Sequence, residues 1–195
     1  MKLTLRVLLA VFMSMVCMSA KYEGLKEDVA INNRKERFGV GIAKKYNMEF
    51  LLVGGQPLIG NQKTRWAVSL LNRNQLTLEQ ARPLVKNIIC EFIYEIKTQP
   101  VYRQWMLFMK KEYSKWDTDI NSSKLGFKIG FWNQNVDRPL APYLAHILVA
   151  DRTVKYYYAD PNTQALQEPP IEETFDQLGI PDFQHRFYNG KWVEN

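Results

Sequence analysis

Cysteine and histidine are scarce in this sequence, with 2 of each among 195 residues. Two cysteines exclude a disulfide-rich scaffold and a zinc cluster built on cysteine. The motifs H-E-x-x-H, C-x-x-C and G-x-S-x-G are also absent, so the common signatures of metal-dependent and nucleophilic hydrolases are missing. The sequence therefore predicts neither a cofactor nor a resident metal ion.

Long apolar runs and clustered charges are missing as well. The apolar stretch over residues 7–18 is shorter than the roughly 20 residues that a helix needs to span a bilayer. Basic residues are spread along the chain and form no polybasic tail, which argues against nucleic acid as a partner. With 46% hydrophobic and 24% charged residues, the chain has the composition of one globular domain.

The first twenty residues have the layout of a secretory signal peptide. Lys2 and Arg6 precede the apolar stretch, no acidic residue occurs in the first twenty residues, and small residues follow the stretch. We therefore expect export to the periplasm, the envelope or the medium, with residues 21–195 as the mature domain and no transmembrane span in it. Two alternatives stay open: residues 1–20 are retained as an anchor, or Cys17 is lipidated as in bacterial lipoproteins.

The formal net charge of +6 is unevenly placed along the chain. Removal of the first twenty residues leaves +4, which divides into +8 over residues 21–128 and −4 over residues 129–195. This polarity suits either an ordinary charged surface or a basic face that meets an anionic partner. The sequence does not decide whether the two parts form separate faces.

Hydrophobic periodicity predicts an α+β fold with an antiparallel sheet of about five strands and helices packed on one face, in the order α-β-β-α-α-β-β-β-α. The expected elements are helices over residues 33–46, 77–96 and 100–116, strands over 50–53, 66–71, 125–132, 144–150 and 153–158, and a short helix after Pro169 and Pro170 that stops at Gly179.

Local signals support two of these elements in particular. Thr77 and Gln80 have the spacing of a capping box before the helix that covers the sheet, and Pro83 is expected to bend that helix. In the strand at 125–132, Gly126 and Gly130 alternate with Lys128 on one face. Glycines at these positions favour the close approach of another element or a ligand.

The segment from Thr77 to Val85, with the pattern T-x-E-x-A-R-x-L-V, resembles small exported bacterial proteins of uncharacterised function. This resemblance implies export and an α+β fold, and it transfers no activity.

Aromatic residues interleaved with lysines are the most suggestive class for binding. Such side chains together bind single-stranded nucleic acid, glycans or peptides, and the expected export argues against nucleic acid. Core packing competes for the same aromatics, since helical spacing directs Trp105 and Phe108 inward. The candidate binding residues are Trp116, Trp132, Tyr157, Lys110, Lys111 and Lys115.

Catalysis is the competing hypothesis: a small extracytoplasmic hydrolase or transferase. It would use His146, His185, or the D-x-D pair Asp117 and Asp119, and it requires at least two of these groups in one cleft. Cys90 lies among apolar helix residues and is expected to be an inert buried thiol. We therefore favour an exported, non-enzymatic binding protein that acts on a protein or envelope surface, and leave its oligomeric state open.

Overall fold

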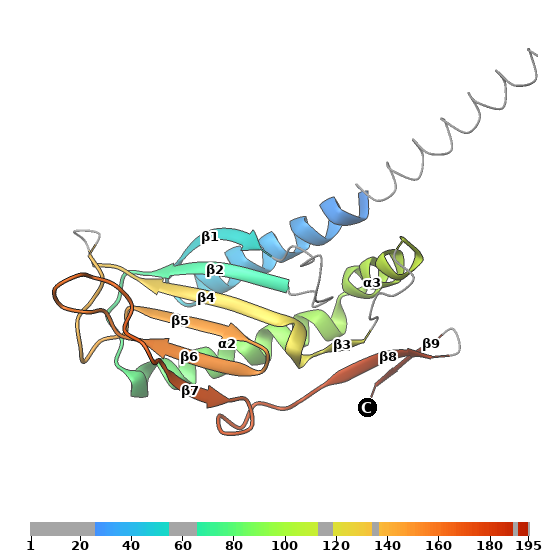
Figure 1. The fold of residues 1–195 in the computed structure, drawn as a ribbon. Helices are drawn as coiled ribbons and strands as arrows, with labels where there is room; N and C mark the ends of the chain where they lie inside the picture. Colours follow the sequence, from blue (N-terminus) through green and yellow to red (C-terminus); the bar gives the residue numbers. More distant parts are fainter. Residues whose placement is uncertain (1–25, 55–65, 113–118, 134–136, 189–190, 195) are drawn as a thin grey trace, which may run out of the picture.

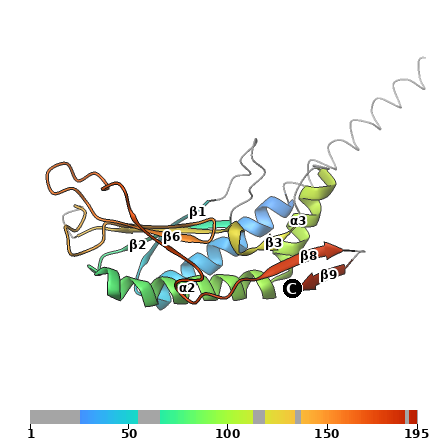
Figure 2. The ribbon, with the colours of Figure 1, turned by 60° about the horizontal axis from the view of Figure 1, so that its bottom comes forward.

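A computed structural model describes residues 26–54, 66–112, 119–133, 137–188 and 191–194 of the chain. It has an α+β architecture, as the sequence predicts. A six-stranded sheet carries the helices on one face, and a three-stranded sheet lies beside it (Figures 1 and 2).

The large sheet is mixed rather than purely antiparallel. Its strands, in spatial order, are β1 (Glu49–Gly54), β2 (Trp66–Asn72), β4 (Leu125–Phe131), β5 (His146–Ala150), β6 (Thr153–Tyr157) and β7 (Ile171–Thr174). Strands β2 and β4 are parallel, and every other neighbouring pair is antiparallel. The helices between β2 and β4 form the crossover that a parallel pair requires. The prediction of five antiparallel strands is therefore wrong in strand number and in this one pairing.

Three helices pack against one face of the sheet. The first covers residues 26–45, and it is followed later in the chain by α2 (Leu78–Thr98) and α3 (Pro100–Glu112). Helix α2 starts at the predicted capping box, in which the Gln80 side chain accepts a hydrogen bond from the Thr77 N–H at 3.0 Å. The helix continues through Pro83 without interruption.

The first helix is already helical at residue 26, seven residues before the predicted start, and as predicted it is ended by Asn47, whose φ of 54° is left-handed. Gly39 lets this helix approach the sheet closely. A Cβ at Gly39 would lie 2.6 Å from the Phe50 ring and 2.9 Å from Val68. Ion pairs from Arg34 to Glu95 and from Lys45 to Glu91 join the helix to α2.

The core lies between the sheet and the helices. Strand register aligns Val68, Phe127, Val149 and Val154 in one row across four strands, and all four side chains are buried. The alternate residues of these strands point to the opposite face, which none of the described helices covers (Figure 2).

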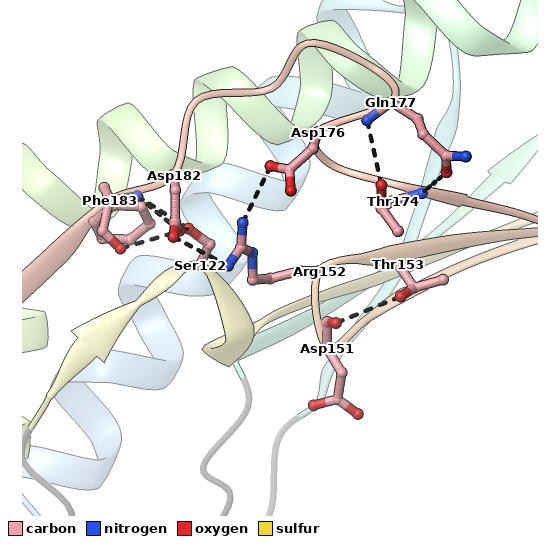
Figure 3. Close-up of polar contacts among 9 residues, drawn as sticks. All are labelled: Ser122, Asp151, Arg152, Thr153, Thr174, Asp176, Gln177, Asp182 and Phe183. Carbon is pink, nitrogen blue, oxygen red and sulfur yellow. Dashed lines mark hydrogen bonds and ion pairs between the residues drawn. The ribbon is translucent and has the colours of Figure 1, made fainter.

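The second sheet contains β3 (Ile120–Asn121), β8 (Gln184–Tyr188) and β9 (Lys191–Glu194), and a short 3-10 turn, η1 (Ser122–Lys124), follows β3. A set of polar contacts joins this sheet to the turn between β5 and β6 (Figure 3). We use the term clasp for its members: Ser122, Arg152, Asp176, Asp182 and Phe183. Arg152, in that turn, pairs with Asp176 at 3.2 Å and with Asp182 at 3.1 Å. Ser122 donates to Asp182 and accepts from the Phe183 N–H at 3.1 Å.

The helix predicted after Pro170 is wrong, because this segment forms the edge strand β7. Its carboxylates are held by cross-strand and cross-layer partners. Glu172 pairs with Lys155 of β6 at 2.6 Å, and Glu173 pairs with Arg82 of α2 at 2.6 Å. Gly179 is left-handed, with φ of 62°, but it lies in a turn rather than at a helix end.

Candidate functional site

Strands β4 and β6 end, and β5 begins, at the same end of the large sheet (Figure 1). Register places His146 between Gly130 of β4 and Tyr157 of β6. These residues belong to the face without helices, because their neighbours in sequence belong to the buried rows. We use the term loop-end cluster for the side chains at this place: Lys128, Trp132, Arg138, His146 and Tyr157.

Ring contacts hold the cluster together. The His146 and Tyr157 ring centroids are 6.0 Å apart, and the Arg138 guanidinium lies 5.6 Å from the centre of the Trp132 ring. Gly130 leaves room for the indole, since a Cβ there would lie 3.0 Å from Trp132 Nε1 and the ring would have to shift. The glycine predicted to leave room for another group therefore makes room for Trp132 of the same chain.

Two loops flank the cluster and are tied to each other. Arg138 donates from its backbone N–H to the Gln164 side chain at 2.9 Å, and its guanidinium donates to the Gln164 carbonyl at 2.5 Å. The loop around Gln164 is itself ordered by Asp160, whose carboxylate accepts the N–H groups of Asn162 and Thr163. Arg138 is thus held in place before any ligand arrives, which lowers the entropic cost of binding.

The electrostatic field at the cluster is positive. Burial, as the largest cause, together with the charges of Lys128 and Arg138 lowers the pKa of His146 to about 4. The imidazole is therefore neutral at neutral pH. Lys128 is exposed, and among the described residues no carboxylate forms an ion pair with it. The cluster thus combines two cations, a neutral histidine and two aromatic rings.

The structure places the described members of the predicted binding residues in two different regions of the molecule. Trp132, which is half-buried, and Tyr157, which is 9% exposed, come together in the loop-end cluster. Lys110 and Lys111 are exposed in the last turn of α3, toward the opposite end of the molecule (Figure 1). Residues 115 and 116, the remaining lysine and tryptophan, lie outside the described residues.

Sequence reasoning missed Arg138 and Gln164, and it noted Lys128 only as a neighbour of glycines. The alternation of Lys128 with Gly126 and Gly130 was a usable signal, because it placed a charge on a sheet face lined by small residues. The contact from Arg138 to Gln164 joins two loops 26 residues apart, and nothing local in the sequence marks it.

The groups required by the catalytic hypothesis lie at two different sheets of the described structure. His185 lies in β8 of the small sheet, is 4% exposed and packs edge-on against Phe183. Asp119 accepts a hydrogen bond from Gln184 at 2.7 Å, and Asp117 lies outside the described residues. His146 belongs to the large sheet. His185 lies opposite Ile120, the residue after Asp119, so these two groups lie together at the small sheet, apart from His146. No described set of three or more His, Cys, Asp or Glu could hold a metal ion.

Cys90 is partly buried on α2 against the core, in agreement with a structural thiol.

Comparisons of the chain with known protein families, with curated proteins and with solved structures find no match. The resemblance of residues 77–85 to exported bacterial proteins therefore stays a prediction. Across the part of the chain that the structure describes, no helix has the length and apolarity needed to cross a membrane.

Proposed function

We propose that this chain is an exported, non-enzymatic binding protein, and that the loop-end cluster is its contact surface for a protein or envelope partner. The observation that carries the proposal is the meeting of Trp132 and Tyr157 with Lys128 and Arg138 on the face without helices. Two of the aromatics expected to bind from the sequence lie here, beside cations contributed by a different strand and loop.

The position of the cluster also supports a binding role. Loops held by a rigid scaffold are the usual carriers of recognition residues. Here the rigid part is the sheet with its buried rows, and the loops are joined by Arg138 and Gln164. Rigid aromatic rings and a fixed guanidinium give contact area and charge at a low cost in side-chain entropy.

The hydrolase or transferase alternative has less support. It needs two polar groups in one cleft, and His146 lies in the large sheet, whereas His185 and Asp119 lie at the small sheet, where His185 is 4% exposed. His146 could act alone as a proton acceptor only weakly, because a pKa of about 4 is far below neutral pH.

Capture from the native envelope fraction tests the proposal. The full chain is compared with Lys128→Glu and, as a matched control, with Lys110→Glu, which makes the same charge change on an exposed lysine at the far end of α3. We expect Lys128→Glu to lose the captured partner and Lys110→Glu to keep it. Equal capture by both variants would contradict the proposed surface.

The N-terminus of the natural protein, read by mass spectrometry in the same preparation, tests export. A start near residue 21, or at a lipidated Cys17, supports it. A start at Met1 in the cytoplasmic fraction would overturn it.

A further inference from the structure

We infer that the loop-end cluster binds an acidic polysaccharide, a chain of saccharide rings that carries carboxylate or sulfate groups. This inference rests on the proposed function and names the ligand class for the same surface.

Charge complementarity is the first step of the argument. Lys128 and Arg138 both act on His146, and no carboxylate is among the groups that influence its ionisation. Two carboxylates that the register places on this face of the sheet are already paired, Glu172 with Lys155 at 2.6 Å and Glu49 with Arg73 at 2.8 Å. An anionic group on a ligand would therefore meet two cations without competition from these carboxylates, and charge-assisted hydrogen bonds to it would be strong.

The ring surfaces are the second step. Trp132 is half-buried and so keeps part of its surface open to the outside, whereas Tyr157 is only 9% exposed and contributes mainly to the packing of the cluster. Tyrosine and tryptophan combine an apolar body with a polar tip, and this suits ligands that are apolar on one side and hydroxylated on the other. Saccharide rings have both surfaces.

The position within the sheet distinguishes a polysaccharide from an acidic peptide. Extended peptides usually bind by adding a strand to a sheet edge, where backbone groups are free to pair. The cluster lies over β4, β5 and β6, which are interior strands with neighbours on both sides. A ligand here must be recognised by side chains alone. Saccharides supply their own hydroxyl and carboxylate partners for that purpose, so the site favours them.

Binding of an anion has a measurable consequence for His146. A negative charge beside Lys128 and Arg138 offsets the repulsion that these cations exert on the protonated imidazole. The pKa of His146, about 4 in the free protein, is therefore expected to rise when the ligand binds. A neutral ligand supplies no such charge, and by burying the ring further it would leave the pKa unchanged or lower it.

The test is calorimetric titration of the full chain, at near-physiological salt, with four polymers. Polygalacturonate carries carboxylates, dextran sulfate carries sulfates, dextran is neutral, and poly-L-glutamate is an acidic peptide. We expect one of the two acidic polysaccharides to bind and both dextran and poly-L-glutamate to bind at least about tenfold more weakly. Lys128→Gln should weaken the binding by about fivefold, and Lys110→Gln should leave it unchanged.

The pKa of His146, followed by NMR with His146→Gln to assign its signal, gives a second readout. An upward shift with the bound polysaccharide supports the inference, and an unchanged or lower pKa overturns it.

Equal binding of poly-L-glutamate or of neutral dextran, or an equal loss in Lys110→Gln, would also overturn it. If no polysaccharide binds but Lys128→Glu still loses its envelope partner, this inference fails and the proposed function stands. If Lys128→Glu captures the partner normally, the proposed function itself fails.

Discussion

Gly39 and Gly41 are two residues apart on the first helix and have opposite surroundings. A Cβ at Gly39 would collide with Phe50 and Val68, whereas a Cβ at Gly41 would meet nothing within 4 Å. Gly41 borders an open hollow between this helix and α2. Because alanine is a better helix former than glycine, Gly41→Ala should raise the free energy of unfolding by about 1 kcal/mol. Gly39→Ala should lower it by about 1–3 kcal/mol through overpacking.

Urea denaturation of the two variants measures both effects, and the opposite signs are the informative result. A stabilising Gly39→Ala would mean that the helix does not approach the sheet as described.

His146 gives a pH dependence of stability with a defined sign. Its pKa falls from 6.5 to about 4 on folding, through burial first and then through Lys128 and Arg138. Between these values the unfolded chain binds more protons, so the stability contributed by the neutral imidazole is complete above about pH 6.5 and is lost as the pH falls toward 4. His146→Gln should therefore lose less stability between pH 7 and pH 4.5 than the wild type, as measured by urea midpoints. Parallel losses in both proteins would contradict the assignment.

At the scale of elements, prediction succeeded where the signal is local. The capping residues Thr77 and Gln80 and the apolar stripe of α2 lie within one element, so spacing alone identifies them. The segment 171–174 was assigned to a helix because proline, acidic residues and a glycine follow in the order typical of one. It is a strand because it pairs with β6, and its carboxylates meet Lys155 and Arg82, which are distant in the sequence. Tertiary partners therefore decided the element, and no local signal contained them.

The turn between β5 and β6 links the two sheets through Arg152. Asp151 and Arg152 have φ of 51° and 62°, positions at which glycine or asparagine is usually preferred. The side chain of Arg152 forms ion pairs with Asp176 and Asp182, and these contacts explain why an arginine occupies this position (Figure 3). Arg152→Gly keeps the turn and removes both ion pairs.

We expect Arg152→Gly to increase amide hydrogen exchange at Phe183 by about three- to tenfold, because the partly exposed pairs contribute modestly to local stability. Asp151→Gly relaxes the same turn, keeps both ion pairs and serves as the control. Exchange that accelerates equally in the two variants would show that the turn, and not the clasp, stabilises the small sheet.

On the scale of the whole molecule, the sequence predicted the α+β class and the helices on one face, but it left the arrangement of strands undetermined. Hydrophobic alternation says which residues share a face and nothing about which strands are neighbours. The parallel pairing of β2 with β4 arises from the crossover through α2 and α3. The candidate site shows the same limit. The sequence suggested Trp132 and Tyr157 as separate binding residues, but it could not predict that they lie in one cluster.

The distribution of charge along the sequence did not indicate the position of the site either. The cluster takes Lys128 from the net basic part of the sequence and Arg138 from the net acidic part. A positive site can therefore form where the two parts of the chain meet. The local potential depends on which cations are close in space, and not on which are close in the sequence.

Lysine footprinting tests most directly whether the loop-end cluster is the binding surface. The full chain is acylated with and without the native envelope fraction, and mass spectrometry compares modification of Lys128 with that of Lys110 and Lys111, all three exposed in the free protein. We predict that the envelope fraction protects Lys128 and leaves the two lysines of α3 unchanged. Protection of Lys110 and Lys111 with Lys128 still reactive would contradict the account.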